Sequence, residues 1–139
     1  MKGKTAQDGT QRVIVDKSEL WGFLYDHAVP GMRGFYFIDS AGGWHLSGIV
    51  ISEDVWHHVV GVYDNPYIQD YLDGERKVNN NIGGFTIKTG VNHFGIGADV
   101  TFGIYRFDGL ISGVRIYSYA LTPAAIRSRF TATRRLFGV

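Results

Sequence analysis

The stretch Val55–Glu75, VWHHVVGVYDNPYIQDYLDGE, contains two short runs that are rich in β-branched and aromatic residues. These runs, Val55–Tyr63 and Ile68–Leu72, have the length and the alternation that are typical of β-strands. Asp64-Asn65-Pro66 separates the runs and Asp73-Gly74 follows them, and both segments favour tight turns. The stretch therefore predicts a strand, a turn, a second strand and a second turn.

Successive residues of the first run point to opposite faces of a strand. One face is then formed by Trp56, His58, Val60 and Val62, and the other by His57, Val59, Gly61 and Tyr63. Both faces are largely apolar, although only one face of a strand in a sandwich must be part of the core. We therefore expect a strand that is covered on both sides, or one whose second face meets a ligand or a partner subunit.

The composition predicts one folded domain. The chain has 139 residues, of which 45% are hydrophobic and 19% are charged, and this is enough to bury a core. Nineteen glycines, eight tyrosines and nine phenylalanines favour many strands and many tight turns. The net charge of +1 argues against a nucleic-acid partner.

The chain has no cysteine, which excludes disulfides and thiolate chemistry. Met1–Gln11 lacks the apolar core of a signal peptide, and no apolar run is long enough to span a membrane, so we expect no membrane partner. We expect a flexible leader over residues 1–11, one domain over residues 12–130, and a basic and apolar tail over residues 131–139.

Turn residues recur at short intervals along the whole chain, which is typical of an antiparallel sandwich of about nine strands. Outside the opening stretch, strands are predicted at Arg12–Val15, Glu19–Tyr25, Gly34–Asp39, Trp44–Ile51, Arg76–Val78, Phe85–Lys88, His93–Ile96 and Leu110–Tyr117. Asn79–Gly84 is predicted as a loop. Thr122 followed by Pro123 predicts the start of the one expected helix, Pro123–Phe130.

Three blocks of sequence resemble the laminin-G-like domains of the concanavalin A-like lectin/glucanase superfamily, over about residues 12–130. The blocks are Trp56-His57-His58-Val59 with Tyr63-Asp64, then Tyr71-Leu72-Asp73-Gly74, then Phe107–Ile111 with Val114–Tyr117 and Ala120-Leu121-Thr122. The resemblance implies an all-β fold, namely an antiparallel β-sandwich of the jelly-roll type with one short C-terminal helix. It also suggests an extracellular or cell-surface setting.

The chain departs from the family in two places. The strands that open a full family member, including a Phe-Thr-x-x-x-Trp strand, are missing or reduced here. Ser112 and Gly113 stand where the family has paired acids, one of which holds a structural calcium in many relatives. We therefore expect no cofactor. Calcium remains an alternative at oxygen-rich turns, whose candidate ligands are Asp64, Asn65, Asp99 and Asp108. Asp and Asn also form such turns without a metal.

Catalytic motifs are absent from the sequence. Retaining glucanases need two carboxylates about 5–5.5 Å apart, and the Glu-x-Asp-x-x-Glu strand that supplies them in this superfamily does not occur. Glu53-Asp54 has no third carboxylate close behind it. No zinc-protease or serine-hydrolase motif occurs either. We therefore expect a protein that is not an enzyme.

Adjacent residues of a strand cannot bind one metal together, so His57 and His58 do not form a shared site. One of them, His57, is a candidate ligand contact. The alternative is that His58 packs beside Trp56 and His57 simply points outward.

Aromatic side chains are the usual platforms for sugar rings, because apolar ring faces stack on them. The candidate ligand-binding residues are Trp44, His45, Tyr36, His57, Tyr67 and Tyr105, with Trp21 as a further aromatic candidate. Packing in the core is the alternative for each aromatic. We expect a non-catalytic binding module, lectin-like and directed to carbohydrate. The alternative is a structural or protein-interaction module that self-associates as a homodimer or larger homo-oligomer, or a fragment of a larger extracellular protein.

Overall fold

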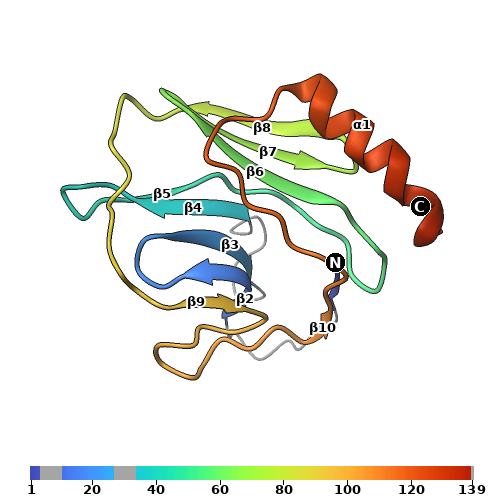
Figure 1. The fold of residues 1–139 in the computed structure, drawn as a ribbon, viewed down its shortest axis with the longest axis horizontal. Helices are drawn as coiled ribbons and strands as arrows, with labels where there is room; N and C mark the ends of the chain where they lie inside the picture. The colour runs from blue at the N-terminus through green and yellow to red at the C-terminus, as the bar shows by residue number, and fades with distance from the viewer. Residues whose placement is uncertain (4–10, 27–33, 139) are drawn as a thin grey trace.

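The computed structural model describes residues 1–3, 11–26 and 34–138. Two antiparallel sheets lie face to face, and a C-terminal helix covers the outside of the smaller one (Figure 1). The larger sheet has the order β5-β4-β3-β2-β9. Its strands are β2 (Gln11–Lys17), β3 (Trp21–Asp26), β4 (Gly34–Ile38), β5 (Trp44–Leu46) and β9 (Phe94–Ile96). This arrangement confirms the predicted all-β sandwich.

The smaller sheet has the order β6-β7-β8. Its strands are β6 (Val59–Asp64), β7 (Tyr67–Leu72) and β8 (Glu75–Asn81). A separate two-stranded pair joins β1 (Lys2–Gly3) to β10 (Gly109–Leu110), so part of the expected leader is a strand. Residues 4–10 of the expected leader lie outside the described residues.

The inner faces of the two sheets form the main core. Ile14, Phe23 and Tyr25 from the larger sheet are buried together with Ile49 and Ile51. Residues of the smaller sheet that pack against this cluster include Val59, Leu72 and Val78. Burial of each such side chain contributes about 1.5–3 kcal/mol, which makes this cluster the principal source of stability.

Strand β6 has the two-sided character that its sequence predicts. On the inner face, a Cβ on Gly61 would lie only 2.2 Å from Phe35 Cβ, and Tyr63 packs on Phe37 at a centroid distance of 4.5 Å. On the outer face, Val60 and Val62 pack against Ile126 of the helix. The prediction of a strand covered on both sides is therefore confirmed.

The helix α1 (Pro123–Thr133) begins as predicted and ends later. The Thr122 side chain accepts a hydrogen bond of 3.2 Å from Ala125 N, and Pro123 occupies the first turn. The helix continues past Phe130 to Thr133 because no glycine or proline stops it, and a 3₁₀ turn, η1 (Arg134–Leu136), follows. No helix of the described residues is long and apolar enough to cross a membrane.

Several predicted strand boundaries are wrong. Strand β6 begins at Val59 rather than at Val55, because the preceding segment bonds to the N-terminal residues and does not continue the pairing with β7: Asp54 N donates to Gly3 O and His57 N donates to Met1 O. Strand β8 extends to Asn81, where a loop was predicted, because its pairing with β7 outweighs the weak strand preference of asparagine.

Three other predicted strands are shorter than expected or do not form as strands. Strand β5 ends at Leu46. The segment Phe85–Lys88 forms only one isolated bridge, between Ile87 and Asp39. The segment Leu110–Tyr117 is a strand only at its start, in β10, because the rest has no neighbouring strand with which to pair.

Candidate functional site

The exposed indole of Trp44 is the most prominent aromatic surface on the larger sheet. Trp44 opens β5 and is 63% exposed, and its ring stacks on Tyr36 of β4 at a centroid distance of 5.1 Å and an interplanar angle of 18°. Tyr36 itself is buried and is part of the cluster on the outer face of this sheet. One face of the indole is thus fixed by protein, and the side chain as a whole remains largely exposed.

Two buried carboxyl groups, Asp16 and Asp99, lie near this cluster. The Tyr36 hydroxyl donates to Asp16 Oδ1. Burial raises the pKa of Asp16 and the nearby charge of Asp99 raises it further. Burial and the bond to Asp16 also raise the pKa of Tyr36, so its hydroxyl keeps its proton. This hydrogen-bonded pair holds the Tyr36 ring in place under Trp44.

His45 does not share a face with Trp44. Its ring packs on Phe37, 4.9 Å away between centroids, and on Phe85, 4.3 Å away. Its Nε2 lies 2.8 Å from Asp39 Oδ2, and this bond, together with the backbone donors of Ala41 and Gly43, lowers the pKa of Asp39. His45 therefore orders the hairpin loop that presents Trp44.

The remaining aromatic candidates are scattered. Tyr67 is 37% exposed at the start of β7, and Trp21 packs on Phe94 at 6.1 Å. Tyr105 is half-buried against the outer-face cluster and has a φ of 57°. The structure brings Trp44, Tyr36 and the Tyr105 cluster onto one face, and it places Tyr67 on the other sheet.

The calcium candidates do not form one group. Asp99 accepts hydrogen bonds from Thr101 N at 2.9 Å and Phe102 N at 3.3 Å, which is the turn-forming role of aspartate. Asp64 and Asn65 lie in the β6–β7 turn, and Asp108 precedes β10. Within the described ranges, no three His, Asp or Glu side chains are grouped as metal ligands. The expectation of no cofactor, with calcium as the alternative, stays a prediction.

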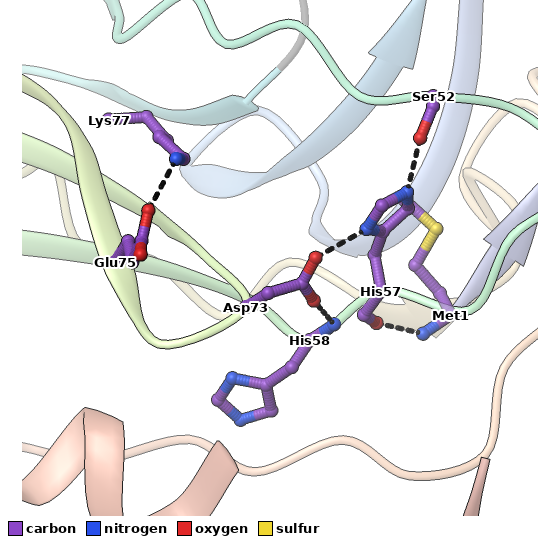
Figure 2. Close-up of polar contacts among 7 residues, drawn as sticks. All are labelled: Met1, Ser52, His57, His58, Asp73, Glu75 and Lys77. Carbon is purple, nitrogen blue, oxygen red and sulfur yellow. Dashed lines mark hydrogen bonds and ion pairs between the residues drawn. The ribbon is translucent and has the colours of Figure 1, made fainter. Parts of the chain in front are cut away.

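His57 is at the centre of a hydrogen-bonded series that sequence reasoning missed (Figure 2). Its Nε2 lies 2.7 Å from Ser52 Oγ and its Nδ1 lies 2.8 Å from Asp73 Oδ2. The Met1 ammonium donates to His57 O at 2.6 Å, and His58 N donates to Asp73 Oδ1 at 2.9 Å. The expectation that His57 points outward is wrong, because its side chain is only 8% exposed.

His58 lies on the opposite side, next to the helix. Its ring is 6.1 Å from that of Phe130, and Trp56 packs on Phe137 at 4.8 Å, which confirms that His58 shares a face with Trp56. Burial lowers the pKa of His58, and the positive charges of the N-terminus, Arg115 and Arg129 lower it further, against the opposing effect of Asp73. Its Nδ1 is buried and has no hydrogen-bond partner in the described part of the chain.

The middle strand of the smaller sheet carries a buried acid that sequence reasoning also missed. Asp70 is fully buried, its oxygens lie 3.3 Å from Phe35 N, and the Ser47 hydroxyl donates to it. Burial raises the pKa of Asp70 to about 7, although both hydrogen bonds oppose this shift. An aspartate in an alternating strand is expected at the surface, so the sequence does not predict that Asp70 is buried.

A cavity of about 600 Å³ lies beside β6. It is lined on one side by residues 57–63 and on the other by residues 113–121, with side chains of the core such as Val15, Phe23 and Phe35 at its base. His57 and His58 line it, whereas Ser52 does not. The alternation of the sequence does not predict this cavity, because the cavity depends on which segments meet beside β6.

A family model described as the concanavalin A-like lectin/glucanases superfamily matches residues 4–127. Among solved structures, the chain is similar to an S-layer domain-containing protein from Clostridium thermocellum, with 20% identity and a TM-score of 0.46. The similarity covers 91% of this chain and 65% of that one, so this chain spans less than two thirds of that chain's length. No curated protein matches. Since the family match extends over most of its residues, the chain belongs to the concanavalin A-like lectin/glucanases superfamily.

Proposed function

We propose that this domain is a non-catalytic carbohydrate-binding module with Trp44 as its stacking platform. The observation that carries the proposal is the rigid exposure of Trp44, which is 63% exposed yet stacked on the buried ring of Tyr36. A sugar ring gains most from an aromatic face that is already ordered, because little side-chain entropy is then lost on binding. The superfamily match supports the proposal as an analogy of fold.

The carboxyl groups near this platform support binding without hydrolysis. Asp16 is 2% exposed and holds Tyr36, and Asp99 is 8% exposed and holds a turn. Neither side chain is free to protonate a leaving group or to attack a sugar, which retaining hydrolysis requires of its two acids.

The series Ser52–His57–Asp73 has the hydrogen-bond order of a serine-hydrolase triad, and we assign it a structural role. His57 faces the cavity while Ser52 lies outside it, so a substrate in the cavity would not meet the hydroxyl. With p-nitrophenyl acetate as substrate, we expect the same hydrolysis rate for the wild type and for Ser52→Ala. A rate that falls with Ser52→Ala would overturn the non-catalytic assignment.

The binding proposal is tested by glycan-array screening and by affinity electrophoresis in gels that contain soluble polysaccharides. We expect at least one glycan to bind, and Trp44→Ala to weaken that binding about fivefold or more, since loss of one aromatic contact costs about 1 kcal/mol or more. Tyr119→Ala is the matched control, because Tyr119 is 64% exposed on another part of the molecule. Absence of binding to every glycan, or equal binding by Trp44→Ala, would contradict the proposal.

A further inference from the structure

One edge of the smaller sheet has unpaired backbone groups. Asp73 N donates to His58 O at 2.9 Å, one position beyond the first pair of the β6–β7 ladder, Val59↔Leu72, so the ladder bonds of β6 fall on the positions that alternate with Val59. Hydrogen-bonded pairs alternate along antiparallel strands, so Val60 and Val62 also bond to β7. The N–H and C=O groups of Val59, Gly61 and Tyr63 then point the opposite way. Within the part of the chain that the structure describes, none of these groups has a backbone partner.

The cavity lies directly against this edge. Its two long walls are continuous stretches of chain, residues 57–63 and residues 113–121. In Figure 1 the segment that leads from β10 to α1 passes along this side of the molecule without becoming a strand. The unpaired residues of β6 are half-buried rather than exposed, so water does not reach them freely. Half-buried backbone groups without partners are costly, and a bound strand would satisfy them.

The size of the cavity fits one strand. A residue of a strand within a packed sandwich occupies about 160 Å³, given its rise, the spacing between strands and the spacing between sheets. A cavity of about 600 Å³ therefore has room for about four residues of a single extended chain. Its apolar base would receive every second side chain, which is how peptides that extend a sheet are recognised.

The charge around the cavity is positive. Arg115, Arg129 and Met1 all line it, and the charge of each acts on His58. Arg129 Nε and His58 Nδ1 are buried without hydrogen-bond partners among the described residues. Asp73, whose negative charge acts on His58, is already engaged by His57 and by the backbone of His58. A carboxylate on the bound strand would supply the missing charge and acceptor.

We propose that the edge of β6 binds an acidic, extended peptide segment of another protein, which inserts between β6 and residues 113–121 as a fourth strand of the smaller sheet. A second copy of this chain fits less well. Symmetric pairing of two β6 edges would bring Arg115 and Arg129 of both copies together, and residues 113–121 stand where the second sheet would continue.

The probe is a fluorescein-labelled peptide of eight residues in which valine alternates with threonine and glutamate. One control peptide has lysine in place of glutamate, and another is N-methylated at alternate residues so that it cannot pair with a strand. By fluorescence anisotropy we expect the glutamate peptide to bind about tenfold or more tightly than the lysine peptide, and the N-methylated peptide not to bind. Hydrogen exchange should slow at the Val59, Gly61 and Tyr63 amides when the glutamate peptide is present.

Two variants locate the peptide on the protein. Arg115→Gln should weaken binding of the glutamate peptide about fivefold, whereas Arg127→Gln, an exposed arginine of α1 outside the cavity, should leave it unchanged. Val59→Pro removes an N–H of the free edge and no bond of the β6–β7 ladder, so it should abolish binding. Because Val59 also packs on the core, its melting temperature should fall, and the matched control is Val59→Ala, which loses the same packing but keeps the N–H and should still bind. Circular dichroism at the assay temperature checks that both variants are folded.

Equal affinity for the three peptides, or unchanged exchange along β6, would overturn the proposal. So would a concentration-dependent dimer in light scattering that Val59→Pro converts to a monomer, since the occupant would then be a second copy of the chain. Binding of glycans at Trp44 is a separate measurement, because Trp44 does not line this cavity. Failure of either proposal therefore leaves the other intact.

Discussion

The two edges of the three-stranded sheet are built for different surroundings. At β8 all residues except Val78 are exposed, and the exposed residues are charged residues and asparagines. Two of them form an ion pair within the strand, in which Lys77 Nζ lies 2.8 Å from Glu75 Oε2 (Figure 2). At β6 the edge residues are Val59, Gly61 and Tyr63, all half-buried beside a cavity.

The difference concerns the unpaired backbone groups of an edge strand, which are either solvated by water or covered by another segment. Lysine and other charged residues keep an edge solvated and discourage further pairing, which is the pattern of β8. An apolar edge without charges, such as β6, is the pattern of a strand that is normally covered. In this three-stranded sheet, the β8 edge therefore discourages pairing with a further strand, whereas the β6 edge favours it.

The largest expected effect lies in β7, between the two edges. Because the pKa of Asp70 in the folded protein is about 7 and its value in the unfolded chain is about 3.9, the folded protein holds this proton more tightly. Its contribution to stability is complete below about pH 4 and is lost as the pH rises through about 7. Between these limits the wild type should lose on the order of 4 kcal/mol of its free energy of unfolding through Asp70. The variant Asp70→Asn should not show this loss.

This prediction is checked by urea unfolding of both proteins at pH 4, 6 and 8. The difference between wild type and Asp70→Asn isolates Asp70 from the other acids with altered pKa values, Asp16 among them. A constant difference at all three pH values would show that Asp70 is not protonated in the folded protein.

The next effect compares the edges directly. A Cβ at Gly61 would lie 2.2 Å from Phe35 Cβ, so Gly61→Ala should destabilise the fold by about 3 kcal/mol through overpacking. Asn79→Ala, at an exposed position of β8, should change the free energy of unfolding by less than about 0.5 kcal/mol. Both values come from denaturant titrations at one pH. Equal effects would mean that the two edges are packed alike.

The smallest effect concerns the turn that joins β7 to β8. Asp73 accepts from His58 N and is bonded to His57, so Asp73→Ala should cost about 1–2 kcal/mol of stability. Glu75→Ala, two residues further along the hairpin, removes only an exposed pair with Lys77 and should be nearly neutral. If thermal melting gives the two variants the same stability, the hydrogen bonds of Asp73 to His57 and His58 do not stabilise the β6 edge.

The sequence predicts the fold well where alternation and turn chemistry agree. The β4–β5 hairpin, the β6–β7 hairpin and the capped start of α1 at Thr122 were all expected from local patterns. Local patterns fail where pairing depends on distant partners. Residues 111–117 alternate like a strand but lack a partner strand among the described residues, and Asn79–Asn81 resembles a loop but pairs with β7.

The candidate sites follow the same division. An exposed aromatic next to a hairpin loop was a local signal, and the sequence predicts Trp44 on that ground. The inward position of His57, the burial of Asp70 and the cavity beside β6 depend on which sheets meet, and alternation alone does not encode this. The pairing of Trp44 with Tyr36 rather than with His45 follows from the register of β4 and β5.

The placement of the three tryptophans gives the protein a set of intrinsic fluorescent reporters. Trp44 is exposed on the proposed glycan face, Trp21 lines the cavity beside β6, and Trp56 packs against Phe137 at the end of the chain. Variants that keep one tryptophan at a time would each emit from a different region. Quenching by iodide should be strongest for Trp44, and a ligand at either surface would change the emission of one indole while the others stay constant.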